Sequence, residues 1–434
     1  MSQAYPFTLV GYRLLTTATA PVAPLIISHR LKRGKEHPAR RNERYGRTEI
    51  PRPAGPLVWI HCASVGELLT VIPLIGRLRE KAFDVLCTSG TITSATIAEL
   101  RLPVGTIHQF ITLDVPQFVD RFFEHWRPDI ALFVESDLWP NLIMAAAKRG
   151  IPLILINGRL SERSFKRWRW APGTVAALLR SFDLCLAQSA THAARFRDLA
   201  APRVATTGNL KLDVPDPPAD ERALALLKEA IAGRTVFAGT STHAGEEMTL
   251  VEVHRRLRNS FPQLLTIIAP RHPERAQGIL EIVRAANLAA RVRSRGELPA
   301  SDTNIYIADT MGELGLIYRL APIVFVGGSL AGHGGQNPIE PAKLGAAILH
   351  GPHVWNFAEI YAALDSAHGA ELVNDVGKLA VRVGAWLKDA DARGAVAAVA
   401  RETVASLGGA LDRTVSALEP YLMRIRLERR AHHA

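Results

Sequence analysis

Short apolar runs alternate with helical patterns along most of the chain, and this alternation restricts the possible folds more than any other feature. Strands are predicted at 57–62, 83–87, 130–134, 153–156 and 184–187, and helices at 68–80, 118–126 and 142–149. A second series predicts strands at 235–238, 264–269, 304–307, 323–326 and 347–349, and helices at 246–259, 273–286 and 338–344. Such alternation predicts an α/β fold with parallel, doubly wound sheets.

A polar, proline-rich stretch, Asp213-Val-Pro-Asp-Pro-Pro218, separates the two series. Because the 434 residues can supply two full cores, we expect two Rossmann-like domains joined by a linker. The predicted parts are a membrane-associated segment and basic linker (1–47), a first domain (48–212), the linker (213–219), a second domain (220–376) and C-terminal helices that pack back toward the first domain (377–434).

The beginning of the chain has the composition of a membrane-surface anchor. Residues 14–28 are apolar but contain Pro21 and Pro24, and about 20 apolar residues are needed to cross a bilayer. Residues 30–47 follow with eight basic side chains, in a chain of net charge +11. Interfacial attachment to anionic headgroups is therefore predicted, and a solvated charged linker is the alternative.

Two Gly-rich segments, 61–67 and 327–341, each follow a predicted strand and carry a carboxylate at the start of a predicted helix. Loops at the carboxyl ends of parallel strands bind ligands, and glycines there let the backbone approach a phosphate. Two such loops in separate halves suggest an enzyme with a cleft and one substrate on each side.

Three residues of the first half are candidates for catalysis. Glu67 could act as a general base, although Ser64-Val-Gly-Glu67 is also a capping box. Glu135 follows the strand at 130–134, and Lys211 lies near the domain junction. A structural ion pair is the alternative for Glu135 and Lys211.

The second half contains a candidate nucleotide site. Pro270-Arg271 ends the strand at 264–269, where a guanidinium group can grip a phosphate. The helix starts Met311-Gly312-Glu313 and Asn337-Pro338-Ile339-Glu340 complete the set, and helix capping alone would also explain the second of them.

Two other clusters admit different interpretations. The loop histidines His243, His272 and His333 match no zinc-ligand spacing, so no metal is expected. A basic and aromatic cluster could stack on nucleic acid, but no nucleic-acid motif accompanies it. Its members are Arg159, Arg163, Lys166, Arg167, Trp168, Arg169 and Trp170.

Eight motifs, in order along about residues 12–364, resemble those of the 3-deoxy-D-manno-octulosonic acid (Kdo) transferases of lipopolysaccharide biosynthesis. The motifs are Ala63-Ser-Val-Gly-Glu67, Glu135-Ser-Asp-Leu-Trp-Pro-Asn141, Asn157-Gly-Arg-Leu-Ser-Glu-Arg-Ser164, Gly208-Asn-Leu-Lys211, Ser241-Thr-His-Ala-Gly-Glu-Glu247, Pro270-Arg-His-Pro-Glu-Arg275, Asp309-Thr-Met-Gly-Glu-Leu314 and the loop 327–341. One departure is Gln336, where the family often has histidine.

This resemblance implies an inverting GT-B glycosyltransferase that transfers Kdo from CMP-Kdo to a lipid A precursor. It implies that Glu67 is the base and that Glu135 and Lys211 belong to the active centre. It also implies that the three clusters of the second half bind CMP, with Glu340 on the ribose hydroxyls. The basic and aromatic cluster would contact the phosphates and acyl chains of the acceptor. Neither a metal nor another cofactor is expected, because a monophosphate leaving group has less charge to neutralise than a diphosphate.

The implied location is the cytoplasmic face of the inner membrane, with a monotopic or N-terminally anchored chain. The alternatives are a GT-B relative that uses another nucleotide sugar, a sugar-nucleotide epimerase and a basic nucleic-acid-binding protein.

Overall fold

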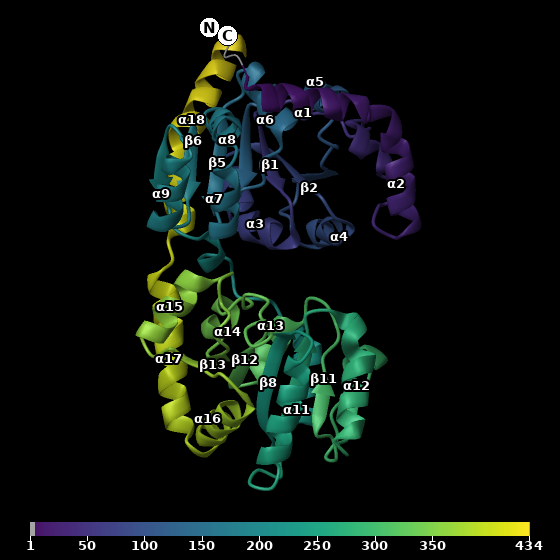
Figure 1. Ribbon diagram of the computed structural model, residues 1–434, viewed down its shortest axis with the longest axis vertical. Coiled ribbons are helices and arrows are strands. Elements are labelled where there is room, and N and C mark those ends of the chain that lie inside the picture. The colour runs from purple at the N-terminus through teal and green to yellow at the C-terminus, as the bar shows by residue number, and fades with distance from the viewer. Residues whose placement is uncertain (1–4, 434) are drawn as a thin grey trace. The chain divides into compact units, whose positions relative to one another are not determined.

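The computed structural model describes residues 5–433 and contains two seven-stranded sheets within that range (Figure 1). All strand pairs in both sheets are parallel. Unit 1 comprises Met1–Val214 and Gly408–Ala434, and unit 2 comprises Pro215–Leu407. The predicted fold class, two Rossmann-like α/β domains, is confirmed.

The sheet of unit 1 has the strand order β3-β2-β1-β4-β5-β6-β7. Its strands are β1 (Leu57–Cys62), β2 (Asp84–Ser89), β3 (Ile107–Phe110), β4 (Ile130–Val134), β5 (Leu153–Gly158), β6 (Leu184–Ala187) and β7 (Val204–Thr206). Its helices are α1 (Phe7–Ala18), α2 (Ala23–Lys32), α3 (Val65–Glu80), α4 (Ile92–Arg101), α5 (Pro116–Trp126), α6 (Pro140–Lys148), α7 (Glu162–Trp168), α8 (Pro172–Leu179), α9 (Ala190–Asp198) and α18 (Ala410–His433). The strand order reverses between β1 and β4, so the loops that follow these strands meet at the point where such sheets bind ligands.

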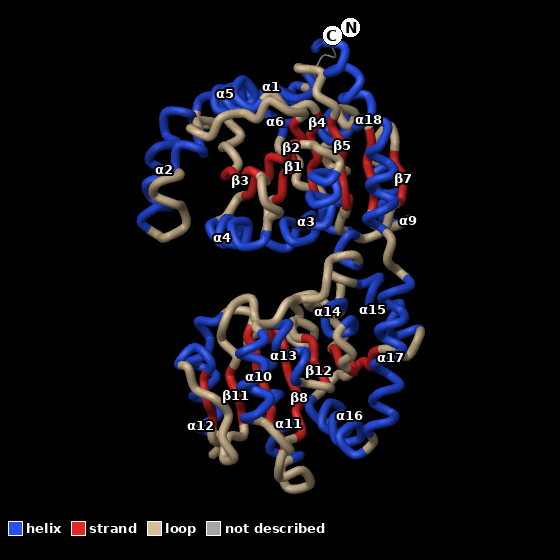
Figure 2. The backbone as a smooth tube through the Cα atoms, turned by 180° about the vertical axis from the view of Figure 1, so that it is seen from behind, coloured by secondary structure: helices blue, strands red, loops and turns tan. Residues whose placement is uncertain are grey.

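The core of unit 1 lies on both faces of its sheet, with helices on either side (Figure 2). All six residues of β1 are buried, as expected for a central parallel strand. Alternate side chains of β1 point to opposite faces of the sheet. On one face, Trp59 packs with Phe122 and Phe133. Val58 and Ile60 belong to the apolar cluster on the other face.

The sheet of unit 2 has the order β10-β11-β9-β8-β12-β13-β14, and its reversal lies between β8 and β12. Its strands are β8 (Thr235–Thr242), β9 (Leu264–Pro270), β10 (Ala290–Val292), β11 (Ile305–Ile307), β12 (Ile323–Val326), β13 (Ala347–His350) and β14 (Ala370–Leu372). Its helices are α10 (Glu221–Ala230), α11 (Glu246–Leu257), α12 (Ala276–Ala285), α13 (Leu314–Leu320), α14 (Ile339–Lys343), α15 (Ala358–Ser366), α16 (Val376–Lys388) and α17 (Ala390–Ser406). Short 3-10 helices complete the two units: η1 (Ala20–Val22), η2 (Arg41–Tyr45), η3 (Leu210–Leu212), η4 (Pro273–Arg275) and η5 (Arg293–Arg295).

The C-terminal helices are divided between the two units. Val383 and Trp386 of α16 and Ala397 of α17 lie in the core of unit 2. Leu418 and Leu422 of α18 join the core of unit 1 instead. Of the segment 377–434, therefore, only the part from residue 408 onward packs with the first domain.

The N-terminal apolar segment is longer than the predicted range 14–28. α1 and α2, joined by the 3-10 turn η1, form a helical segment from Phe7 to Lys32 that is long and apolar enough to cross a membrane by length and composition. One face of α1 is fixed to unit 1: the Tyr12 hydroxyl donates to Asp114 Oδ2 at 2.9 Å, and Asn141 Nδ2 donates to Thr16 Oγ1 at 3.0 Å.

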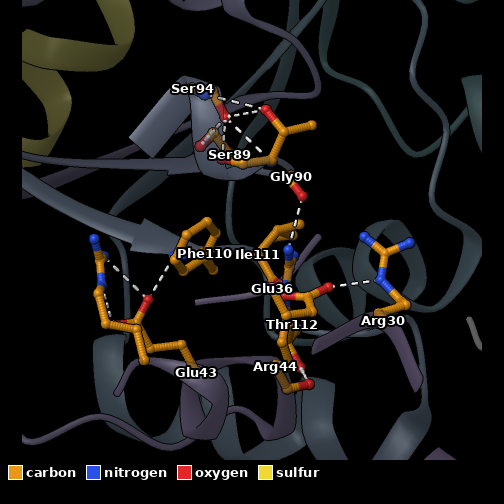
Figure 3. A network of polar contacts seen from close by, with 12 residues as sticks. Arg30, Glu36, Glu43, Arg44, Ser89, Gly90, Ser94, Phe110, Ile111 and Thr112 are labelled. Carbon is orange, nitrogen blue, oxygen red and sulfur yellow. Dashed lines mark hydrogen bonds and ion pairs between the residues drawn. The ribbon is translucent and has the colours of Figure 1, made fainter. Parts of the chain in front are cut away.

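The basic segment that follows is partly built into the fold (Figure 3). Arg44 is only 4% exposed, and its guanidinium donates to Glu36 Oε2 at 2.9 Å and to the Gly90 carbonyl at 2.7 Å. Arg40 donates to Glu43 Oε1 at 2.8 Å, and Glu43 Oε2 accepts from the Phe110 amide at 2.6 Å. The expectation that residues 30–47 are simply a basic membrane anchor is wrong for Arg40 and Arg44, because their charges are neutralised within unit 1.

Candidate active site

Glu67 lies in the first turn of α3, directly after the loop that ends β1. Ser64 caps the helix: its Oγ accepts a hydrogen bond from the Glu67 amide at 3.3 Å. The Glu67 carboxylate accepts from the Ala63 amide at 2.8 Å and from the Ser64 hydroxyl at 3.0 Å. It does not return to the Ser64 amide as in the predicted capping box. A carboxylate has about four acceptor sites, so this one can still accept a substrate proton.

The environment of Glu67 makes its carboxylate a stronger base than usual. The side chain is 9% exposed, and burial together with the nearby charge of Glu135 raises its pKa from 4.5 to about 7. The hydrogen bonds from Ala63 and Ser64 act in the opposite direction and do not cancel this rise. A pKa close to neutrality is suited to general-base catalysis.

Glu135 and Lys211 meet at the end of β4. Lys211 Nζ donates to Glu135 Oε1 at 2.8 Å, and both side chains are largely buried. Glu135 has a φ of +60°, which is unusual for a residue with a side chain and is common at functional sites. Lys211 is positioned by η3, whose Leu210 amide donates to Asn157 Oδ1 at 3.0 Å. The ion pair that the sequence offered as the alternative for Glu135 and Lys211 is therefore formed. Such a pair is compatible with a catalytic role for both residues.

Two polar residues beside this pair had no role in the sequence interpretation. His61 is buried, and burial lowers its pKa to about 4, so its ring is neutral near pH 7. Trp59 donates to Thr88 Oγ1 at 2.9 Å, and His61 Nδ1 forms a hydrogen bond with the same hydroxyl group at 3.1 Å. The remaining ring nitrogen, Nε2, faces Asp137 Oδ2 at 3.9 Å. The sequence feature that could have pointed to these two residues is Asp137 itself, a second carboxylate two residues after Glu135.

In unit 2, Arg271 follows β9, beside three aromatic rings that the sequence placed in separate motifs. The His243 and His333 rings stack with centroids 4.1 Å apart, and the His272 ring lies 5.9 Å from His243. Gln336 Nε2 lies 3.3 Å from His243 Nε2. Burial, together with the neighbouring His333, lowers the pKa of His243. This cluster can bind an anion through hydrogen bonds.

A buried carboxylate shapes the Gly-rich loop after β12. Glu246 Oε2 accepts from the Gly328 amide at 2.7 Å, and Oε1 accepts from the Ser329 and Leu330 amides at 3.0 and 2.9 Å. The glycines had suggested that these backbone amides bind a substrate phosphate. Because Glu246 accepts their hydrogen bonds, they are not available to one. Glu246 was missed as a site residue, although it is a carboxylate at a helix start directly after a strand.

The other predicted residues of unit 2 differ in accessibility. Met311 is exposed, and Gly312 has a φ of +83° in open space. Glu313 is held by Arg293 at 2.8 Å, an ion pair that lowers the pKa of its carboxyl group. The structure thus gives Glu313 a structural partner.

The segment 337–340 begins α14. Asn337 Oδ1 accepts from the Ile339 amide at 3.0 Å, and Asn337 Nδ2 donates to Glu340 Oε1 at 3.1 Å. Pro338 and Ile339 are buried. Burial raises the pKa of Glu340.

Within residues 5–433, no group of three or more His, Cys, Asp or Glu side chains could hold a metal ion. Arg271 and Lys211 are the site cations that could balance a phosphate or carboxylate.

Residues 39–214 match the model of a family described as 3-deoxy-D-manno-octulosonic-acid transferase (kdotransferase). The chain is 38% identical to the "probable 3-deoxy-D-manno-octulosonic acid transferase, mitochondrial" of Arabidopsis thaliana, over 86% of each chain. It is 32% identical to the 3-deoxy-D-manno-octulosonic acid transferase of Haemophilus influenzae, over 92% of this chain and 94% of that one. For the transferase of Bordetella pertussis the identity is 33%, over 95% and 100% of the two chains.

Solved structures share the architecture at low identity. A glycosyltransferase from Rickettsia africae is similar with a TM-score of 0.60 and 12% identity, over 85% of this chain and 99% of that one. The UDP-GlcNAc 2-epimerase of Neisseria meningitidis has a TM-score of 0.59 and 13% identity, over 84% and 100%. At these identities the likeness supports the fold alone.

Proposed function

Because the chain belongs to the family of Kdo transferases, we propose that it transfers Kdo from CMP-Kdo to a lipid A precursor of the lipid IVA type. The transfer inverts the anomeric centre and is a step of lipopolysaccharide core biosynthesis. The observation that carries the proposal is identity of 32% or more to such transferases over most of the chain.

In the proposed reaction, a hydroxyl oxygen of the acceptor forms a bond to the anomeric carbon of Kdo while the bond to the CMP phosphate breaks. Glu67 takes the hydroxyl proton, and CMP leaves with the electron pair. Lys211, oriented by Glu135, stabilises negative charge at the reacting centre. Arg271 holds the phosphate of CMP and Glu340 its ribose hydroxyls. These residues supply the charges that the reaction needs, so the scheme uses no metal ion.

The first test is release of CMP from CMP-Kdo in the presence of the lipid acceptor, compared with UDP-sugars as alternative donors. The Glu67→Gln variant should lose transfer yet bind CMP normally. Glu80→Gln, at the exposed end of the same helix, is the matched control and should be fully active. Turnover near wild type in Glu67→Gln would place the base elsewhere. Lower stability with full activity per folded molecule would leave Glu67 only a structural role, through its hydrogen bonds with Ala63 and Ser64.

The second test concerns the donor site. Loss of one charged hydrogen bond costs roughly 1.5–3 kcal/mol, so Arg271→Ala and Glu340→Ala should each weaken CMP binding about 10- to 100-fold. Arg284→Ala, on an exposed position of α12, is the control. Calorimetric titration of CMP measures the effect, and unchanged affinity in both variants would move the nucleotide site.

We also propose a monotopic location on the cytoplasmic face of the inner membrane. The outer face of α1 supports it, since Phe7, Leu14 and Leu15 are 96%, 66% and 65% exposed. The polar contacts of Tyr12 and Thr16 hold the other face against unit 1. A helix fixed along one side to a folded unit is better placed to lie in the interface than to span the bilayer.

A further inference from the structure

An apolar pocket of about 350 Å³ lies in unit 1 between α1 and the loop that follows β4. Its walls come from distant parts of the chain: Leu9 and Tyr12 of α1, Leu138 and Trp139 of the loop, Trp168 of α7 and Leu178 of α8. A volume of this size is within the range of small-ligand sites.

The walls of the pocket are fixed by contacts behind them. Leu9 and Leu178 belong to the buried core, and Trp139 and Trp168 pack partly against it. Thr8 Oγ1 and Thr174 Oγ1 lie 2.5 Å apart and join α1 to α8. The indole N–H of Trp139 is satisfied by Asp137 Oδ2 at 2.9 Å, so this ring contributes an apolar surface.

The pocket adjoins the proposed reaction centre. Asp137 lines it and lies 3.9 Å from His61 at the end of β1. The loop that forms one wall begins with Glu135, which is paired with Lys211. A substrate bound at these groups therefore has an apolar cavity within reach, in the same unit.

We propose that this pocket binds one acyl chain of the lipid acceptor and so positions the acceptor for transfer. The inference rests on the proposed function. The lining provides no cationic group for a sugar phosphate, whereas tryptophan and leucine side chains suit a hydrocarbon chain. The acyl chain would enter the pocket from the membrane along the exposed apolar face of α1. The shared catalytic loop favours the acceptor over a phospholipid of the bilayer.

Labelling provides a direct test. A lipid acceptor with a photoreactive diazirine at the end of one acyl chain should label peptides that contain residues 8–12, 138–140 or 168–178. A phospholipid with the same diazirine, at equal concentration in the same micelles, should not. Labelling that falls elsewhere, or equal labelling by the phospholipid, would overturn the proposal. Wild-type protein that is labelled but releases no CMP would contradict the proposed function alone.

Kinetics provide the second test. Thr174→Phe should fill the pocket and lower kcat/KM for the lipid acceptor at least tenfold, mainly through KM, with unchanged affinity for CMP. Gly173→Phe places the same ring in open space one residue earlier and is the matched control. This control should retain wild-type kinetics. A folded Thr174→Phe variant, checked by its melting temperature, that has wild-type KM would contradict the inference.

Discussion

At the scale of single residues, the chemistry of unit 1 depends on how Glu67 is buried. Its two hydrogen bonds would favour a charged carboxylate, but burial and the negative charge of Glu135 outweigh them. The result is a base that is about half ionised near pH 7. The two glutamates differ in their partners: Lys211 Nζ donates to Glu135, whereas Glu67 accepts from an amide and a hydroxyl group.

The pH profile follows from this arrangement. Only the ionised form of Glu67 can take a proton, so kcat/KM should rise with pH through an apparent pKa of about 7. Glu135→Gln removes a charge that raises this pKa, and the rising limb should therefore move toward lower pH, whatever the loss of rate. Glu80→Gln should leave the limb in place. An unchanged limb in Glu135→Gln would show that another group titrates.

At the scale of elements, the segment around η2 is fastened to the edge of the sheet by buried charges. Glu36, Glu43 and Arg44 are nearly inaccessible. Glu43 and Arg44 have partners in or beside β2 and β3, and Glu36 accepts from Arg44. A buried ion pair contributes little to stability as a whole, but removal of one partner leaves an uncompensated charge. The segment before β1 therefore belongs to the folded unit.

Arg44→Met should lower the free energy of unfolding by about 3–5 kcal/mol, because Glu36 and the Gly90 carbonyl would lose a buried donor. Arg41→Met, three residues earlier on the same turn but exposed, should change it by less than about 0.5 kcal/mol. Denaturant unfolding of the two variants measures the difference. Equal stability would mean that the network is not a structural fastening.

At the scale of the whole molecule, membrane attachment should depend on apolar burial and on charge together. Leu14, Leu15 and Leu25 are 66%, 65% and 71% exposed, and the exposed Arg41 and Arg47 remain available to anionic lipid. Each basic residue near such a surface contributes on the order of 1 kcal/mol, a share that salt screens.

High salt should therefore release the protein only in part, and detergent should be needed for full release. Replacement of Leu14, Leu15 and Leu25 by Gln should shift the protein to the soluble fraction without a change in CMP affinity. Leu226→Gln, an exposed leucine of unit 2, is the control. Flotation with anionic and neutral vesicles decides the question: equal binding to both excludes the electrostatic contribution, and binding to neither excludes the anchor.

The order of strands and helices could be predicted from the sequence, because apolar periodicity is encoded within each element. β1, β4, β9 and β12 lie where the apolar runs predicted them, and Glu67, Glu135 and Arg271 accordingly stand at their carboxyl ends. The strands that were missed, β3, β7, β10 and β14, have only three or four residues at the sheet edges. Their residues are only partly buried, so they lack the continuous apolar run that marks β11 and β12, which are equally short.

Only the tertiary structure determines which partners the charged groups find when those partners lie far away in the chain. Glu246 occupies the amides of residues 328–331, and Arg44 contacts the carbonyl groups of Gly90 and Ile111. No local pattern distinguishes these side chains from solvated ones, because their environment is created only when separate elements meet. The raised pKa of Glu67 has the same origin. Burial and the nearby charge of Glu135 cause it, and both arise only when the sheet folds and brings β1 and β4 together.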